Sequence, residues 1–201
     1  MYDLIIIGAG PAGSNLARLL NNRYKVLLID KRDMENENSK NKKIKSCGGL
    51  LAPDAQKMIA QLGLALPKDI LVNPQIFAVR TIDMTNNIER LYQRFYLNFD
   101  RDKFDKWLIS LVPDRVEKSF NSLFKDYKKV EEGYQVRYIH KGQERIARTK
   151  ALVAADGGHS HIRGLISKGK DISMPKEYIS IQQWFKCSEP IPYYMAIFDE
   201  K

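Results

Sequence analysis

Apolar and polar positions follow two different periods along the chain, and the changes of period mark the expected helices and strands. Residues 3–7 form an apolar run rich in β-branched side chains, which predicts a strand buried on both faces. Residues 11–21 have a helical pattern, and residues 24–29 form a second buried run that ends at Asp30. The apolar side of the helix is expected to consist of Leu16, Leu19 and Leu20. The chain therefore begins with an expected strand–helix–strand unit.

The turn between the first strand and this helix has the glycine spacing of a dinucleotide-binding loop. Gly8 permits a tight turn, Gly10 lets the backbone approach a pyrophosphate, and Gly13 allows the helix to pack against the strand. Pro11 suits the first helical turn, and the helix N-terminus favours a negative charge. Asp30 ends the second strand and can accept hydrogen bonds from an adenosine ribose. This acid disfavours a 2′-phosphate, so FAD or NAD is expected rather than NADP, with a chance glycine-rich turn as the alternative.

Beyond this unit, short helices are mixed with strands of period two. Helices are expected at residues 53–62, from residue 100 to just before Pro113, and at residues 160–166. Strands are expected at residues 76–84, 88–98, 116–120, 123–130, 134–140, 143–149, 151–155, 178–186 and 193–198. Glycine turns at 132–133 and 141–142 indicate a β-meander, and residues 33–45 are expected to form a charged loop.

The composition is that of an ordinary globular domain, with 44% hydrophobic and 28% charged residues. No apolar run is long enough to span a membrane, and the first apolar run lacks the basic flank of a signal peptide. Cys47 and Cys187 lie far apart without a CxxC spacing, which suits a reducing compartment. A cytoplasmic location is therefore expected.

The net charge of +9 raises the question of an anionic partner. The dense basic cluster runs from Lys40 to Lys45, in a stretch that also holds Glu35 and Glu37. The sequence has no RNA- or DNA-binding motif and no basic helix with interleaved aromatic residues, so no nucleic-acid partner is expected. A solvated basic surface is the favoured interpretation. Attraction to a phosphorylated or membrane-associated substrate, with peripheral membrane contact, is the alternative.

Three features follow one another in an order that resembles a known group of flavoproteins. The 8–13 glycine motif comes first and is followed by Asp30. Arg101 then stands at the start of an expected helix, and Asp156-Gly157 follows a late strand. This order is similar to the FAD-dependent oxidoreductases of the glutathione-reductase-like type, in the branch with p-hydroxybenzoate hydroxylase. The stretch 45–50 also resembles the Cys-Gly-Gly loop of geranylgeranyl reductases.

Longer runs at residues 47–56, 73–77 and 181–185 closely resemble the CbrA family within that group. The resemblance implies an α/β fold: a Rossmann-like FAD-binding domain of the glutathione-reductase type with a β-meander, and an incomplete, mostly antiparallel β substrate domain. The expected segments are 1–72 and 100–168 for the FAD-binding domain and 73–99 and 169–201 for the substrate domain.

The resemblance also implies a set of cofactor contacts. The FAD pyrophosphate is expected on the loop 8–13, its ribose on Asp30, and its phosphate and ribityl region near Arg101. Asp156-Gly157 is expected at the ribityl chain and marks the approach of NAD(P)H, a candidate electron donor, in relatives. The Cys-Gly-Gly loop is expected beside the isoalloxazine. The full set of expected FAD contacts is Gly8, Gly10, Pro11, Ala12, Gly13, Asp30, Lys31, Gly48, Gly49, Arg101, Asp156 and Gly157.

The sequence departs from the family pattern in two respects. Leu50 follows Gly49, where geranylgeranyl reductases usually show a third glycine. No stretch matches the family's third FAD motif, a Gly-(Asp/Glu)-Ala-Ala-Gly turn, or its remaining substrate-domain strands and C-terminal helices. The chain is therefore expected to be the N-terminal part of a longer flavoprotein that binds FAD weakly or not at all on its own.

Cys47 is the candidate catalytic residue because saturating a double bond needs a proton as well as a hydride, and this thiol is the titratable group of its loop. The alternative is a small buried residue that packs near the flavin ring. The alternative to a cofactor contact of Arg101 is a surface pair with Asp105. The alternative to a cofactor contact of Asp156-Gly157 is a routine turn. His159 and His161 lack acid or thiol partners at ligand spacing, so no metal site is expected.

The sequence thus predicts, for the complete protein, an FAD-dependent oxidoreductase that reduces double bonds of a small apolar, isoprenoid-like or lipid-linked substrate. Two alternatives stay open: a flavin-dependent monooxygenase on the same scaffold, and a non-catalytic truncated fragment.

Overall fold

The computed structural model describes residues 1–20, 23–34, 46–168, 176, 178–186, 188–189 and 191–200. They fall into two compact units: unit 1 combines residues 1–44 with 105–178, and unit 2 combines residues 45–104 with 179–201. The basic cluster from Lys40 to Lys45, most of the expected loop 33–45, and Cys187 lie outside the described residues.

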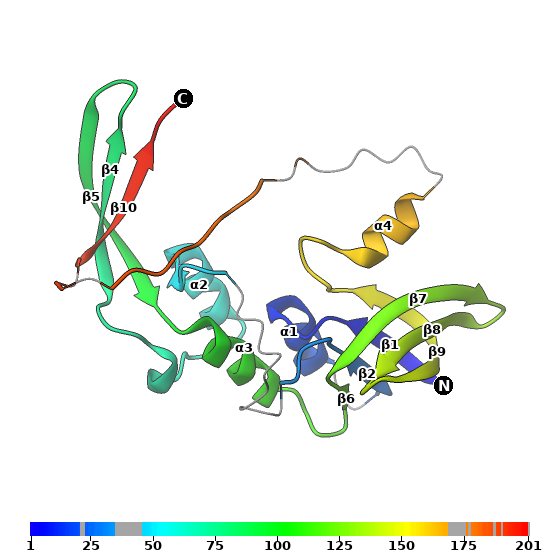
Figure 1. Cartoon of the computed structure of the whole chain (residues 1–201). Coiled ribbons are helices and arrows are strands. Elements are labelled where there is room, and N and C mark those ends of the chain that lie inside the picture. Colours follow the sequence, from blue (N-terminus) through cyan, green and yellow to red (C-terminus); the bar gives the residue numbers. More distant parts are fainter. Residues whose placement is uncertain are drawn as a thin grey trace. The chain divides into compact units, whose positions relative to one another are not determined.

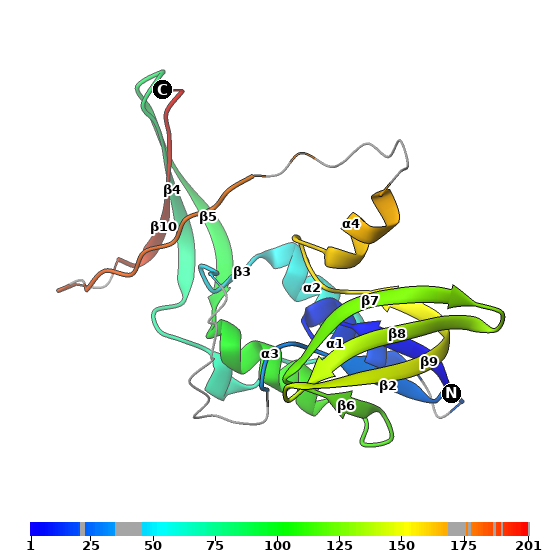
Figure 2. The same ribbon diagram turned by 45° about the vertical axis from the view of Figure 1, so that its right-hand side comes forward.

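Unit 1 contains, among its described residues, a six-stranded sheet with the order β6-β2-β1-β9-β8-β7 (Figures 1 and 2). Its strands are β1 (Tyr2–Ile7), β2 (Val26–Ile29), β6 (Glu117–Ser119), β7 (Ser122–Val130), β8 (Gly133–His140) and β9 (Gln143–Ala154). The strands β6, β2, β1 and β9 pair in parallel, whereas β7, β8 and β9 pair antiparallel. The predicted α/β fold, Rossmann-like with a β-meander, is confirmed.

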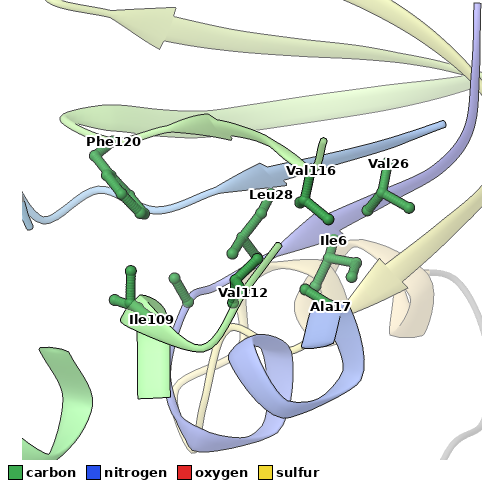
Figure 3. Close-up of a cluster of buried hydrophobic side chains, with 9 residues drawn as sticks. Ile6, Ala17, Val26, Leu28, Ile109, Val112, Val116 and Phe120 are labelled. Atoms are coloured by element: carbon green, nitrogen blue, oxygen red, sulfur yellow. The ribbon is translucent and has the colours of Figure 1, made fainter. Parts of the chain in front are cut away.

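Strand β1 is buried on both faces, as its apolar run predicted. Its side chains alternate because successive residues of a strand point to opposite faces. Ile6 joins one core cluster (Figure 3), whose members are Ile6, Ala9, Ala17, Val26, Leu28, Ile109, Val112, Val116 and Phe120. Ile5 and Ile7 join a second cluster, with Leu27, Ile29, Phe124, Val136, Tyr138 and Ile162. Each such aliphatic side chain contributes roughly 1.5–3 kcal/mol on burial, so β1 is held from both sides.

Helix α1 (Pro11–Leu19) packs on the sheet with small side chains, and here the predicted apolar side was partly wrong. The buried residues of the helix are Gly13, Ser14 and Ala17. Leu19 is 54% exposed, whereas Leu16 and Leu20 pack against the edge of the first cluster. The small face lets the helix axis approach the sheet closely, which a row of leucines would prevent.

The expected strands 143–149 and 151–155 are one continuous strand, β9, rather than two. The first part of β9 completes the meander by pairing with β8, and its last part pairs with β1 up to Ala154. The part that pairs with β1 was expected to be buried. Instead Leu152 and Val153 are half-buried and Ala151 and Ala154 are exposed.

Unit 2 contains, among its described residues, a four-stranded sheet with the order β10-β4-β5-β3. Its elements are β3 (Leu50–Leu51), α2 (Pro53–Gln61), the 3-10 turn Lys68–Ile70, β4 (Ile76–Asp83), β5 (Ile88–Asn98) and β10 (Tyr193–Phe198). β4 and β5 correspond to the strands expected at residues 76–84 and 88–98 and pair as a hairpin, and β10 pairs in parallel with β4. Helix α3 (Arg101–Ser110) begins in unit 2 and continues into unit 1, and α4 (His161–Ser167) lies in unit 1.

The strand expected at residues 178–186 is absent from the described part of the chain. Alternating apolar residues are necessary for a half-buried strand, but the strand also needs a neighbour to pair with. In this segment the apolar side chains are exposed instead, with exposed fractions of 78–94%: Tyr178, Ile179, Ile181, Trp184 and Phe185.

The compact units also divide the chain differently from the expected segments. Residues 45–72, expected in the FAD-binding domain, group with the unit 2 sheet. The second boundary lies within α3, after Phe104, because Asp105 and the rest of the helix group with unit 1. The four-segment division of the complete protein stays a prediction.

Candidate functional site

The parallel strands β2, β1 and β9 end side by side, and the glycine turn lies at this edge of the sheet. Ile7 is in register with Ile29 on one side and with Ala154 on the other. The backbone N–H of Ala155 donates to the carbonyl of Ile7 at 2.8 Å, so the chain after β9 passes beside the turn. Ligands of open α/β sheets bind at the carboxyl ends of parallel strands, which makes this edge the candidate site.

Gly8 and Gly13 have the structural roles that the motif predicts. Gly8 has a φ of +105°, and a Cβ there would lie 2.3 Å from the carbonyl oxygen of Ala155. A Cβ on Gly13 would lie 1.8 Å from the carbonyl oxygen of Gly8. Both contacts are with backbone, which cannot give way, so the turn, α1 and the end of β9 fit together only with glycine at these positions. Pyrophosphate binding by the loop stays a prediction.

The N-terminus of α1 is suited to an anion. Gly10 is the N-cap with extended backbone, no side chain caps the helix, and Pro11 occupies its first turn. Ala12 is exposed at the same end. Because the first N–H groups of a helix have no partner within the helix and lie at the positive end of its dipole, this arrangement favours phosphate oxygens.

Asp30 lies where the sequence placed it, but its carboxylate is more heavily engaged than the motif indicates. It is 7% exposed. Its Oδ2 accepts from the backbone N–H of Ala9 at 2.7 Å, and its Oδ1 accepts from the backbone N–H of Arg32 at 2.8 Å. The guanidinium of Arg32 adds two further hydrogen bonds, Nε to Oδ1 and Nη2 to Oδ2, both at 3.1 Å. Lys31, which was expected to contact the cofactor, has an exposed side chain.

Arg32 is the residue that sequence reasoning missed. Its Nη1 donates to Oδ2 of the buried Asp105 at 2.6 Å, and its Nη2 also donates to the carbonyl of Ala9 at 3.2 Å. Burial by itself would lower the pKa of Arg32, but the hydrogen bonds and charges of Asp30 and Asp105 outweigh it and raise the pKa above its ordinary value. Asp105, which the alternative interpretation of Arg101 placed in a surface pair, is 1% exposed and lies 73 residues beyond Arg32.

Asp156-Gly157 follows the end of β9, as predicted, and Asp156 helps to begin the next helix. The carboxylate of Asp156 accepts from the Ser160 hydroxyl at 2.6 Å and from the backbone N–H of Ile162 at 3.3 Å. The Ser160 hydroxyl caps α4 by accepting from the N–H of Arg163 at 3.0 Å. Gly157 has a φ of +90° and open space where a Cβ would be. Its contact with a cofactor stays a prediction.

The Cys-Gly-Gly loop lies in unit 2, and Arg101 lies against it. Nη1 of Arg101 is 3.7 Å from Sγ of Cys47. Gly49 has a φ of +69°, and a Cβ there would lie 2.4 Å from the carbonyl of Phe99, so its glycine is required by the neighbouring backbone. Gly48 has no neighbour within 4 Å of a Cβ position, and its backbone is open to a ligand.

Gln182 is a second residue that sequence reasoning did not single out. Its amide Nε2 donates to the carbonyl of Cys47 at 3.1 Å, across 135 residues of sequence. The exposed segment 178–186 is therefore tied to the Cys47 loop through this side chain. The sequence could have pointed to Gln182 because this residue lies in the run 181–185, one of the runs that carry the family resemblance.

One histidine of the H-x-H pair, His161, has contacts with strand β7. Nε2 of His161 donates a hydrogen bond to the carbonyl of Lys125 at 2.9 Å, and the imidazole ring lies edge-on to Phe124. Within the described ranges, no three His, Cys, Asp or Glu residues gather in a way that would hold a metal ion.

Known proteins match this chain along its whole length. A family model described as an NAD(P)-binding Rossmann-like domain matches residues 6–34. The protein CbrA of Escherichia coli O157:H7 is 40% identical over 198 residues, which cover 98% of this chain and 54% of that protein. This chain is a homologue of CbrA. The CbrA protein of Shigella sonnei matches to the same extent, and the predicted family resemblance is confirmed.

Solved structures share the fold. A geranylgeranyl bacteriochlorophyll reductase-like protein of Thermoplasma acidophilum superposes with a TM-score of 0.61 at 22% identity, covering 78% of this chain and 39% of that chain. The flavin-dependent brominase Bmp2 superposes with a TM-score of 0.60 at 26% identity, covering 83% of this chain and 40% of the brominase chain. The chain spans about half the length of the curated relatives it matches. None of the helices in its described part has the length and apolar character needed to cross a membrane.

Proposed function

We propose that the chain provides the adenine-dinucleotide site of an FAD-dependent oxidoreductase. The observation that carries the proposal is the edge where β2, β1 and β9 end. There a glycine turn, an uncapped helix N-terminus and the carboxylate of Asp30 converge. These groups fit the pyrophosphate and the ribose diol. Similar structures named as flavin-dependent support FAD, rather than NAD, as the resident dinucleotide. When bound, FAD would supply hydride transfer.

We infer reduction of a double bond in an apolar, isoprenoid-like substrate as the reaction of the complete protein. Such a reduction needs a proton at the carbon that does not receive the hydride. Cys47 is the proposed donor, and its thiol lies 3.7 Å from the guanidinium of Arg101, which can hold it in place. Gln182 fixes the backbone of the same loop. NAD(P)H is the proposed electron donor, because reduced flavin must be regenerated after each turnover.

The nucleotide site can be tested with ADP, because all of its expected contacts lie in unit 1. We expect ADP to shift the backbone amide signals of residues 8–13 in the NMR spectrum of the 201-residue chain. Asp30→Asn should weaken ADP binding by roughly tenfold or more, since a hydrogen bond to a charged group is worth about 1.5–3 kcal/mol. Asp126→Asn is the matched control: this carboxylate pairs with Arg137 on the meander, and its loss should leave ADP binding unchanged. If Asp30→Asn bound ADP as tightly as the unchanged chain, the proposed nucleotide site would be wrong.

The flavin and its reaction are tested on full-length CbrA of Escherichia coli. A flavin absorbance spectrum in the purified protein, lost when the aligned aspartate is replaced, supports the proposal. A protein that purifies without flavin and does not take it up would contradict it. Rapid oxygen consumption by the reduced flavin with a hydroxylated product would establish a monooxygenase instead, a reaction known from proteins of the same fold named as monooxygenases.

A further inference from the structure

The carboxylate of Asp30 has no acceptor position to spare in the nucleotide-free chain. An ionised carboxylate accepts at about four lone-pair positions. Two are filled by the backbone N–H groups of Ala9 and Arg32, at 2.7 and 2.8 Å. The other two are filled by Nε and Nη2 of the Arg32 guanidinium, both at 3.1 Å. A ribose diol also brings two donors, so the diol and the guanidinium require the same two positions.

We propose that Arg32 is a built-in occupant of the ribose site, which the adenosine diol must displace from Asp30 when the dinucleotide binds. The proposal rests on the dinucleotide site proposed above and adds to it a residue that sets its affinity and its selectivity for ribose. The backbone donors belong to the glycine turn and to the end of β2, so they stay in place. The side chain of Arg32 is the part of the arrangement that can move.

Asp105 makes this displacement feasible. It already accepts from Nη1 of Arg32 at 2.6 Å and is 1% exposed. A guanidinium that left Asp30 for bulk water would also take a charged partner away from the buried Asp105, which is costly. With Asp105 as a fixed anchor, Arg32 can rotate about its Nη1 contact and keep one carboxylate partner while it releases the other.

The arrangement also explains why an arginine lies here at all. Asp30 is 7% exposed, and a buried carboxylate without partners destabilises a fold. Arg32 satisfies Asp30 until a nucleotide arrives, and the nucleotide then satisfies it instead. The consequence is an affinity for the diol-bearing nucleotide that is reduced by the free energy of the Asp30–Arg32 contact, and a dependence of binding on the diol that is weaker than a bare carboxylate would show.

The first test observes Arg32 directly in the full 201-residue chain. The Nε–Hε signal of Arg32 is assigned by its loss in the spectrum of Arg32→Lys. Saturation with ADP is expected to move this signal, because Nε loses its contact with Asp30. Saturation with 2′,3′-dideoxyadenosine diphosphate, which lacks the diol, is expected to leave the signal in place. An unchanged Arg32 signal at ADP saturation would show that nucleotide and guanidinium share Asp30, and would overturn the proposal.

The second test removes the competitor without changing the local charge. Asp30, Arg32 and Asp105 together carry one negative charge, and the double variant Arg32→Met with Asp105→Asn carries the same. We expect this variant to bind ADP roughly tenfold more tightly by calorimetry, with a smaller gain for the dideoxy analogue. Equal or weaker ADP binding by a folded double variant would contradict the proposal. The first test stands by itself if this variant does not fold.

The two proposals fail in different ways. If ADP leaves the amide signals of residues 8–13 unchanged, both the nucleotide site and the role of Arg32 are wrong. If ADP binding depends on Asp30 but the Arg32 signal does not move, the nucleotide site stands and only the inference about Arg32 is wrong.

Discussion

At the scale of single residues, the spacing of Gly8 and Gly13 was informative because the neighbouring backbone leaves no room for a Cβ at either position. Gly13 lies in the first turn of α1, and glycine within a helix costs up to about 0.5–1 kcal/mol relative to alanine. It is required because a Cβ would lie 1.8 Å from the carbonyl oxygen of Gly8. The close contact of the turn with the helix therefore overrides helix propensity at this position.

Gly13→Ala should destabilise unit 1 by roughly 3 kcal/mol or more, since overpacking against backbone cannot be relieved by a rotamer change. Gly164→Ala is the matched control in α4, where a Cβ would meet nothing within 4 Å. It should stabilise the chain by about 0.5–1 kcal/mol through helix propensity. Urea unfolding of both variants measures the difference, and similar free energies of unfolding would contradict the described contact.

The sequence predicted the residues of the candidate site only where the position of a residue follows from the residues next to it in the chain. The position of Asp30 follows from the end of a buried run, and Ser160 as a cap follows from its place before a helix. Arg32 was missed because its function depends on Asp105, which lies 73 residues away. Gln182 was missed for the same reason, since its partner is the carbonyl of Cys47, 135 residues away. Single-sequence patterns carry no information about such contacts.

At the scale of elements, periodicity predicted the parallel unit and the meander well, and it failed where pairing decides the outcome. The residues of β9 were expected to form two strands because the mostly polar stretch 143–149 gives way to an apolar run after Lys150. Pairing with β8 and then with β1 nevertheless keeps the strand continuous. The segment 178–186 is rich in β-branched and aromatic residues, as strands are, but pairs with no strand in the described part of the chain. A strand forms only when a second segment pairs with it, and the pattern of one segment does not show whether such a partner exists.

The cap of α4 gives a prediction at this scale. Ser160→Ala removes the acceptor of the Arg163 N–H and should cost about 1 kcal/mol, a typical value for an N-cap. Faster amide hydrogen exchange in residues 161–167, with the meander unaffected, is the expected readout. Ser167→Ala at the other end of the helix is the control, because its hydroxyl donates to the carbonyl of Gly164 at an exposed site. Equal exchange rates in the two variants would show that the cap contributes nothing.

The junction of β1 and β9 has a predictable pH dependence. The pKa of Asp3 is lowered, first by its hydrogen bond with Lys150 and then by the backbone N–H of Lys25. A carboxyl with a lower pKa in the folded state stabilises the fold above its ordinary pKa of about 4, and this contribution disappears as the pH falls through the folded value. In the Asp3→Asn variant, the free energy of unfolding should therefore decrease less as the pH falls than it does in the unchanged chain. Thermal unfolding between neutral pH and pH about 3 tests this, with Asp114→Asn, a fully exposed carboxylate, as the control.

At the scale of the whole molecule, the two units differ in how much apolar surface they bury. Unit 1 has core clusters on both sides of β1. In unit 2, large apolar side chains on the sheet are exposed, among them Phe77, Leu91, Phe95, Ile197 and Phe198. Exposed large apolar side chains promote association when they lie together. The net charge of +9 opposes association through repulsion, so the two effects compete within one chain.

Trp184 reports on this balance because it is 79% exposed, whereas Trp107 on α3 is only partly exposed. In dilute solution we expect the emission of Trp184 to be quenched readily by acrylamide, and Trp184→Phe to leave a weaker emission that is more resistant to quenching. Raising the protein concentration or the salt concentration should protect Trp184, because salt screens the repulsion while the apolar contacts stay. The double variant Ile181→Ser with Phe185→Ser is expected to remain quenchable at all concentrations. A Trp184 protected already in dilute monomer would contradict the exposed course of residues 178–186, and protection that salt does not increase would show that charge does not keep the chains apart.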